Sequence, residues 1–265
     1  MVWQRVFSAF LAAPLVLLAA YLGGPVWPLL LLGLGAAAWL ELQHLVQQPV
    51  QLFRTTGLVL LVISIGAVGV NPGYILPTLV LSLLTFMAMQ LVDYDETKWP
   101  AAALAISSYF YLGLPLIHLL LLRTGTGDWR FVLLALLDTW AYDVFAFFAG
   151  RNFGRVRPWI RISPKKSVEG LIGGMVGSVS MTLVMLKIIR PGLSPLQWLL
   201  ISLFLGLGVG TLAHLGDLAE SAIKRAYKVK DSGHFLPGHG GLLDRMDSVL
   251  FVAPFVYYVV SYLLL

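Results

Sequence analysis

The sequence predicts an all-α polytopic membrane protein with about nine transmembrane helices. Hydrophobic residues make up 58% of the chain and charged residues only 12%, whereas a soluble domain is about one quarter charged. Long apolar runs recur along all 265 residues, and each helical span needs about 20 of them. Nine spans consume most of the chain, so no separate soluble domain is expected.

The apolar runs place the spans in order along the chain. They lie near residues 6–22, 26–46, 57–70, 74–92, 101–122, 130–149, 168–189, 196–214 and 248–265. Arg5 precedes the first run, but no cleavage site of small residues follows it, so a retained helix is expected in place of a signal peptide. The third run is short, which predicts a tilted or incomplete crossing. Turn sequences separate several runs, namely Gly23-Gly24-Pro25, Asn71-Pro72-Gly73, Lys98-Trp99-Pro100 and Arg190-Pro191-Gly192.

Two long polar segments, 150–167 and 215–247, flank a predicted two-helix hairpin and therefore share one side of the membrane. With nine spans, the N-terminus and the loops at 47–56 and 93–100 lie on that side too. It then carries fourteen of the eighteen Lys and Arg residues. Because such residues concentrate in cytoplasmic loops, the sequence predicts two polar cytoplasmic loops.

The composition excludes several classes of site. The chain has no cysteine, which rules out disulfides, thiolate metal sites and thiol catalysis. The net charge is +5, but no nucleic-acid partner is expected for a chain of this kind. A cysteine-free chain with about nine spans fits a prokaryotic inner membrane.

The segment from Ser221 to Asp247 stands out, because it holds five basic residues, three aspartates, two histidines and four glycines. Charge is costly near a bilayer, so this density indicates chemistry on a phosphate at the membrane surface. Asp244 and Asp247 are three residues apart and share a face of any helix that starts there. That pair suits Mg²⁺ and equally suits a simple helix cap.

The glycine-rich stretch just before these acids, Pro237-Gly238-His239-Gly240-Gly241, suits an anion nest of backbone N–H groups. His239 is either a phosphate donor or a partner in a loop hydrogen bond. Upstream, Asp217 and Glu220 end the eighth apolar run, where an acid at the membrane edge is usually functional. The basic residues that follow them often serve only as orientation or lipid-contact signals, but here they alternate with acids.

Further polar residues lie in or beside other runs. Asp138 and Asp143 are five apart in the sixth run and differ by about 140° around a helix, so at least one faces the protein, either as a helix–helix contact or as a functional group. Lys165 and Lys166 precede the seventh run and suit a phosphate. Four glycines in that run have the spacing of close helix packing, namely Gly170, Gly173, Gly174 and Gly177.

Two histidines near acids leave simpler interpretations open. Glu41 and His44 share a face of the second run and suggest a buried pair. His214 lies one turn before Asp217, where it either orients that acid or occupies the membrane interface.

The segment as a whole resembles the signature of phosphatidate cytidylyltransferases (CDP-diacylglycerol synthases). The matching residues, all at the family's spacing, are Ser221, Lys224-Arg225, Lys230-Asp231, Pro237-Gly238-His239-Gly240-Gly241 and Asp244-Arg245-Met246-Asp247. The GRNFG, SPKK and EG stretches also resemble this family. Residues 130–265 carry the resemblance and are interpreted as the C-terminal catalytic region, with N-terminal transmembrane helices over 1–129, in one integral domain. One departure is Ser167-Val168, where the family usually has Thr-Trp.

The resemblance implies an Mg²⁺-dependent enzyme that converts CTP and phosphatidate, a membrane lipid, into CDP-diacylglycerol and pyrophosphate at the cytoplasmic face. It implies metal ligation by Asp217, Asp244 and Asp247, with Asp143 and Asp138 near a second cation. Catalytic contacts are expected from Asp217, Lys224, Arg225, Asp244 and Asp247. Substrate contacts are expected from Lys165, Lys166, Ser221, Lys230, His239, Gly240, Gly241 and Arg245. A homodimer is left open.

Two alternatives stay open at this stage. One is a cytidylyltransferase that uses another lipid phosphate, such as a phytanyl ether phosphate or a polyprenol phosphate. The other is a cation-coupled transporter that uses acids within the membrane. The clustering of the charges on one cytoplasmic surface favours the enzyme.

Overall fold

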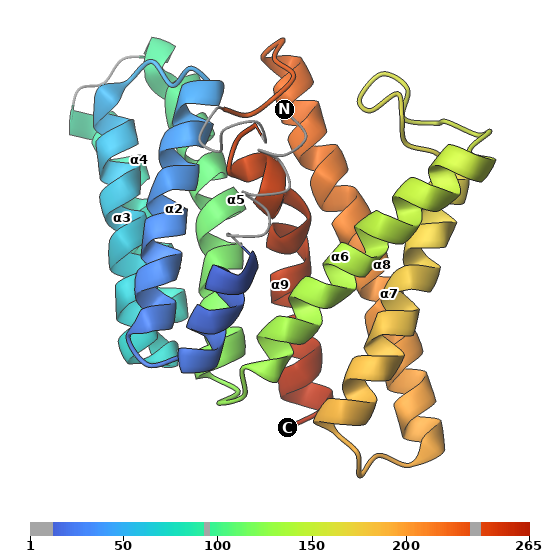
Figure 1. Cartoon of the computed structure of the whole chain (residues 1–265). Helices are drawn as coiled ribbons and strands as arrows, with labels where there is room; N and C mark the ends of the chain where they lie inside the picture. Colours follow the sequence, from blue (N-terminus) through green and yellow to red (C-terminus); the bar gives the residue numbers. More distant parts are fainter. Residues whose placement is uncertain (1–12, 93–95, 234–239) are drawn as a thin grey trace. The chain divides into compact units, whose positions relative to one another are not determined.

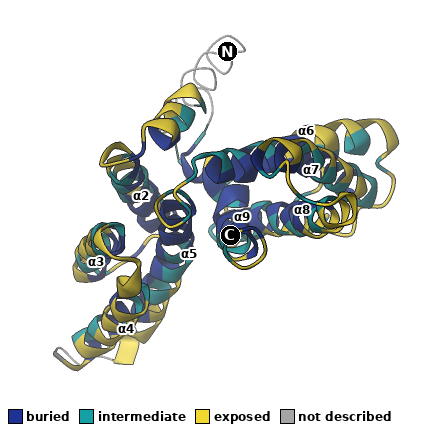
Figure 2. Cartoon of the chain, turned by 90° about the horizontal axis from the view of Figure 1, so that it is seen from below, coloured by how far each residue is buried: buried dark blue, intermediate teal, exposed yellow. Residues whose placement is uncertain are grey.

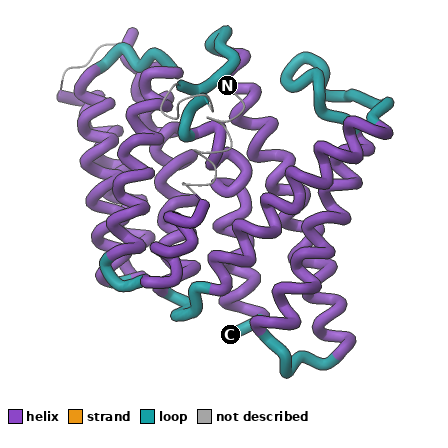
Figure 3. The backbone as a smooth tube through the Cα atoms, viewed as in Figure 1, coloured by secondary structure: helices purple, strands orange, loops and turns teal. Residues whose placement is uncertain are grey.

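The computed structural model describes residues 13–92, 96–233 and 240–265 (Figure 1). Eight helices in these ranges are long and apolar enough to span a membrane, and the described residues form no strand (Figure 3). The all-α polytopic membrane fold is therefore confirmed. The helices are α2 (Val26–Leu45), α3 (Gln51–Val70), α4 (Ile75–Val92), α5 (Trp99–Thr124), α6 (Arg130–Phe153), α7 (Val168–Ile189), α8 (Pro195–Ala226) and α9 (Leu243–Leu263), with the 3₁₀ turns η1 (Pro72–Tyr74) and η2 (Glu96–Lys98).

The first and third predicted spans differ in extent from the helices of the structure. A shorter apolar helix, Ala13–Leu22, matches the end of the first predicted span, and residues 6–12 of that span lie outside the described residues. The third span is not short, because α3 begins at Gln51 and has 20 residues. The apolar run starts later than the helix because the first turns of α3 hold polar residues such as Arg54.

The eighth helix differs most from its predicted span, 196–214. It has 32 residues and continues to Ala226. The segment expected to be a loop from residue 215 therefore begins as helix. Charged residues end the apolar run but not the helix, because pairs of side chains four residues apart stabilise the helix beyond that point. Lys224 pairs with Glu220 in this way, and Ser221 Oγ donates to Asp217 Oδ1 at 3.3 Å.

A Schellman motif ends α8. Val229 N donates to Lys224 O at 2.9 Å, and Lys228 N donates to Arg225 O at 3.1 Å. Lys228 has a φ of 57°, in the left-handed region where this motif usually places glycine. This missing glycine explains why the end of the helix could not be recognised in the sequence.

Two other helices, α6 and α9, differ less from their predicted bounds. The sixth helix runs to Phe153 and not to 149. The last helix starts at Leu243, five residues before the predicted start at 248. Asp244 and Asp247 therefore lie in its first turns, as their spacing predicted.

The chain forms two compact units, Met1–Gly125 with Asp231–Asp244, and Thr126–Lys230 with Arg245–Leu265. In the first unit, α3 packs against α2, α4 and α5. The indole of Trp39 lies against Gly57, and its Nε1 donates to Arg54 O at 2.9 Å. A buried hydroxyl network joins three helices, because Tyr109 OH lies 2.6 Å from Ser64 Oγ and 2.9 Å from Ser82 Oγ.

In the second unit, α7 packs against α6 and α8, and the faces that these helices turn to one another are buried (Figure 2). The four glycines of α7 confirm the packing interpretation. A Cβ on Gly170 would lie 3.1 Å from Ala146 O, and one on Gly177 would lie 2.8 Å from Ala141 O. Ser167 caps α7 by accepting from Gly170 N at 3.1 Å. This close packing holds both α6 and α8 against α7.

Candidate functional site

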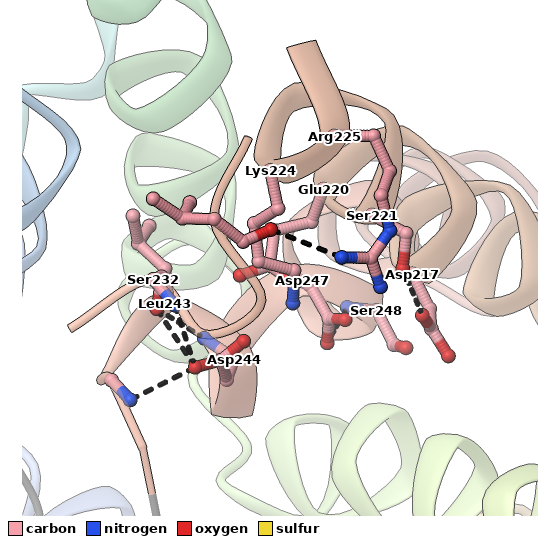
Figure 4. A network of polar contacts seen from close by, with 12 residues as sticks. Asp217, Glu220, Ser221, Lys224, Arg225, Ser232, Leu243, Asp244, Asp247 and Ser248 are labelled. Carbon is pink, nitrogen blue, oxygen red and sulfur yellow. Dashed lines mark hydrogen bonds and ion pairs between the residues drawn. The ribbon is translucent and has the colours of Figure 1, made fainter. Parts of the chain in front are cut away.

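The site in the second unit begins with an ion pair between the loop after α6 and the helix α8. Lys166 Nζ lies 2.8 Å from Asp217 Oδ2 and 3.4 Å from the carbonyl oxygen of His214. Ser221 donates to the other oxygen of Asp217 (Figure 4). Three residues singled out in the sequence, Lys166, Asp217 and Ser221, therefore meet in space.

The loop that carries Lys166 is held against α8 by further contacts. Arg225 Nε donates to Ile162 O at 3.3 Å. The ring of Trp159 lies edge-on to that of His214, with centroids 4.4 Å apart. Tyr142 of α6 lies with its hydroxyl 2.7 Å from His214 Nδ1. His214 therefore anchors the loop through its ring and its carbonyl, which is a more specific role than the sequence indicated.

Two more acids act electrostatically on this ion pair. Asp143 is exposed on α6 and interacts with the charges of Asp217 and Lys166. Asp247 on α9 interacts with those of Asp217 and Asp143. Its Oδ1 accepts from Ser248 N at 2.7 Å. Three helices, α6, α8 and α9, thus each contribute an aspartate to one negative cluster, with Lys166 beside it.

Gly216 explains how α9 comes so close to α8. A Cβ on this residue would lie 2.5 Å from Asp247 O and 3.1 Å from the Cα of Ser248. Only glycine allows two backbones to approach this closely. The residue directly before Asp217 thus sets its distance from Asp247.

The predicted phosphate-binding cations occupy different surroundings. Lys224 is buried and pairs with Glu220 one turn earlier on α8. The remaining cations are exposed and lie at the polar end of the second unit, namely Lys165, Arg225, Lys230 and Arg245. Arg245 also interacts with the charge of Asp143. His239 lies outside the described residues.

Asp138 lies apart from this cluster, inside the helix bundle. It is completely buried, and its Oδ2 accepts from Thr182 Oγ1 of α7 at 2.5 Å. Within the described residues its Oδ1 has no hydrogen-bond partner. The helix–helix contact anticipated for one of the two acids in this run is therefore Asp138, while Asp143 faces the cluster.

Asp244 and the glycines before it form a separate group in the first unit. Asp244 Oδ2 accepts from Gly241 N at 2.9 Å and from Ser232 N at 3.0 Å, and it lies 3.0 Å from Ser232 Oγ (Figure 4). Gly240 has a φ of 82°, and a Cβ there would lie 2.8 Å from Asp244 Oδ2. Asp244 therefore organises the turn that leads into α9, and the simple helix cap that its position suggested is not what its hydrogen bonds form. Its predicted role as a metal ligand stays a prediction.

Glu41 joins the same group and was not recognised as functional in the sequence. Its carboxylate accepts from Leu242 N and Leu243 N at 2.8 and 3.0 Å. His44, its predicted partner, is exposed. The signal that could have revealed Glu41 is an acid within an apolar span, which usually has a specific partner.

The donors in the second unit suit a hard divalent cation, because all of them are carboxylate oxygens. Among the described residues, no three His, Asp or Glu side chains already converge as a metal site. Mg²⁺ usually takes only one or two carboxylates and completes its shell with water and substrate phosphates. The neighbouring like charges of Asp217 and Asp247 therefore fit such an ion without a preformed cage.

Comparison with known proteins finds similarity along almost the whole chain. A model described as "Cytidylyltransferase family" matches residues 3–263. A phosphatidate cytidylyltransferase of Bacillus subtilis is 33% identical over 97% of both chains. One from Thermotoga maritima is 48% identical over 48% of this chain and 47% of its own, and one from Staphylococcus saprophyticus is 35% identical over 68% and 66%.

Proposed function

Because this chain belongs to the cytidylyltransferase family, we propose that it transfers the cytidylyl group of CTP to phosphatidate, giving CDP-diacylglycerol and pyrophosphate. The observation that carries this proposal is the contact of Lys166 with Asp217. It brings together two polar segments that are far apart in the sequence, beside further acids from α6 and α9. The relatives do not favour another lipid phosphate or a cation-coupled transporter.

The reaction needs both anions to approach each other. A phosphate oxygen of phosphatidate attacks the α-phosphorus of CTP and forms a new P–O bond. The bond from the α-phosphorus to the bridging oxygen breaks, and that oxygen leaves with pyrophosphate. Because a phosphate monoester is already ionised at neutral pH, no strong general base is required, and catalysis depends on positioning and charge.

The basic residues at the polar end of the second unit supply the positive charge. Lys166 is held in place by Asp217 and by the carbonyl of His214, so its ammonium is already positioned for a phosphate oxygen. The exposed Lys165 and Arg225 flank it on the loop and on α8. We assign these three residues to the phosphates of the two substrates.

Asp217 and Asp247 are the residues that would hold Mg²⁺. When bound, this ion offsets the charge of the CTP phosphates and of the departing pyrophosphate. The two aspartates come from helices whose backbones touch at Gly216, so their separation is fixed by packing. Asp143 stays a proposed contact to a second cation.

We infer that the site faces the cytoplasm of a bacterium and that the protein lies in the inner membrane. The described part of the chain contains eight candidate spans, so it is an integral membrane protein. In the nine-span arrangement predicted from the sequence, fourteen of the eighteen Lys and Arg residues lie on the side of the two polar segments, which is typical of the cytoplasmic side. CTP is a cytoplasmic nucleotide.

A transfer assay with several lipids tests the proposed function. Purified protein is incubated with Mg²⁺, CTP labelled at the α-phosphorus and one of three acceptors, namely phosphatidate, a phytanyl ether phosphate or a polyprenol phosphate. The expected result is a labelled CDP-lipid formed fastest from phosphatidate. Faster reaction with another lipid phosphate would correct the substrate, and no product with any acceptor would contradict an enzyme of this class.

A further inference from the structure

Glu41 places a carboxylate at the start of α9, although it comes from α2. Its Oε1 accepts from Ser232 Oγ at 2.5 Å and from Leu243 N at 3.0 Å. Its Oε2 accepts from Leu242 N at 2.8 Å. One side chain thus holds three donors that lie about 200 residues further along the chain.

The three donors have little access to water. Ser232 is 4% exposed, Leu242 is 7% exposed and Leu243 is 1% exposed. Buried N–H groups need partners within the protein, and the first N–H groups of a helix carry partial positive charge. A carboxylate satisfies both needs, because it only accepts hydrogen bonds and carries negative charge.

Two glycines allow the chain to pass this close to Glu41. A Cβ on Gly233 would lie 2.9 Å from Glu41 Cδ, and a Cβ on Gly241 would overlap Glu41 Oε1. Gly241 belongs to the stretch that suggested a phosphate nest in the sequence. In the structure its neighbours are the carboxylates of Glu41 and Asp244.

We infer that Glu41 is a positioning residue for cytidylyl transfer, which rests on the proposed function. Its carboxylate fixes the first peptide groups of α9, the helix on which Asp247 follows four residues after Leu243. Its hydrogen bonds are to Ser232, Leu242 and Leu243, so in this role it acts without touching a substrate. It acts by holding Ser232 and the start of α9 in one arrangement.

Kinetics of Glu41 variants separate this role from others. In Glu41→Gln an amide group replaces one acceptor oxygen and cannot accept from a backbone N–H. We expect kcat to fall on the order of a hundredfold, with the KM for CTP little changed. Glu41→Asp keeps the charge and should recover part of the rate. His44→Gln, an exposed position one turn later on the same helix, is the matched control and should behave as wild type.

A second readout does not depend on activity. The chain has no cysteine, so a single Leu242→Cys substitution reports on the start of α9. Leu242 is 7% exposed, and its cysteine should react slowly with a maleimide in the folded protein. Adding Glu41→Gln should speed this labelling, whereas adding His44→Gln should not.

Two results would overturn the inference. One is a lower KM for CTP in Glu41→Gln, which would mean that the carboxylate occupies the place of a phosphate. The other is an unchanged kcat, whether or not the labelling changes. If the wild-type protein formed no CDP-lipid while Glu41→Gln still accelerated labelling, the proposed function would fail and the contact at α9 would stand.

Discussion

The close approach of α8 and α9 at Gly216 makes Gly216→Ala the most informative substitution in the second unit. The added Cβ would lie 2.5 Å from Asp247 O, whereas ordinary contact begins at 3.4 Å. The three nearest atoms all belong to the backbone of Asp247 and Ser248, so no side chain can rotate away. The two helices must therefore separate by about 0.9 Å at this point, from the difference between these distances.

This separation has two calculable effects. Overpacking of this kind usually lowers the free energy of unfolding by about 1–3 kcal/mol. A displacement of about 1 Å between catalytic groups lowers a rate on the order of a hundredfold. Because Asp217 and Asp247 lie on the two helices that move, we expect the larger effect on kcat.

Two control substitutions isolate the effect of geometry. Gly66→Ala in α3 adds a Cβ that meets nothing within 4 Å. It should leave kcat unchanged and should not lower stability, because alanine favours a helix over glycine. Gly208→Ala adds a Cβ between the same two helices as Gly216→Ala, but against the ring of Phe255, which can move. It should lower the thermal unfolding midpoint with a smaller loss of kcat.

The assay is CDP-diacylglycerol formation at saturating CTP and phosphatidate, with thermal unfolding in detergent measured on the same samples. A Gly216→Ala protein with wild-type kcat would refute the reasoning, because the two aspartates would then not need their close spacing. Equal losses of kcat in Gly216→Ala and Gly208→Ala would refute it as well, since general packing would explain both.

Two further predictions concern the metal site, and a third concerns the end of α8. Asp247→Asn should abolish turnover while the thermal unfolding midpoint stays near that of the wild type, and near-normal activity with Mg²⁺ would sink its assignment to the metal. Removal of divalent cations with EDTA should stop product formation and Mg²⁺ should restore it; full activity in EDTA would exclude the ion from the reaction. Lys228→Gly should raise the free energy of unfolding by about 1 kcal/mol without changing kcat, as measured by thermal unfolding and transfer assays, and a loss of stability would show that the left-handed residue is not strained.

Much of the fold could be predicted because apolar runs of span length identify helices directly. The predicted two-helix hairpin also places the 150–167 and 215–247 segments together, and the ion pair of Lys166 with Asp217 confirms this placement. Periodicity identified the glycines of α7 as packing residues. These features depend on local sequence or on simple topology.

The length of α8 could not be predicted because hydropathy reports the end of an apolar run and not the end of a helix. Ser221 and Lys224 continue the helix through contacts four residues apart. The helix ends at Lys228, whose backbone has a left-handed conformation. Glycine is the residue usually expected at this position.

Long-range contacts were equally inaccessible to sequence patterns. Glu41 accepts hydrogen bonds from groups about 200 residues further along the chain, and the residues next to it in the sequence do not indicate these partners. Gly216 resembles an ordinary glycine before an acid, and only the crossing of α9 shows why it has no side chain. The roles of such residues depend on tertiary contacts, and a single sequence does not identify their partners.

The most direct test of the central claim is the stoichiometry of transfer by the purified wild-type protein. CTP labelled at the α-phosphorus is incubated with phosphatidate and Mg²⁺, and labelled lipid and pyrophosphate are counted in the same reaction. We predict one pyrophosphate for each labelled CDP-diacylglycerol, with both products absent in Asp217→Asn. Release of labelled CMP without labelled lipid, or equal rates in the wild type and Asp217→Asn, would contradict the account.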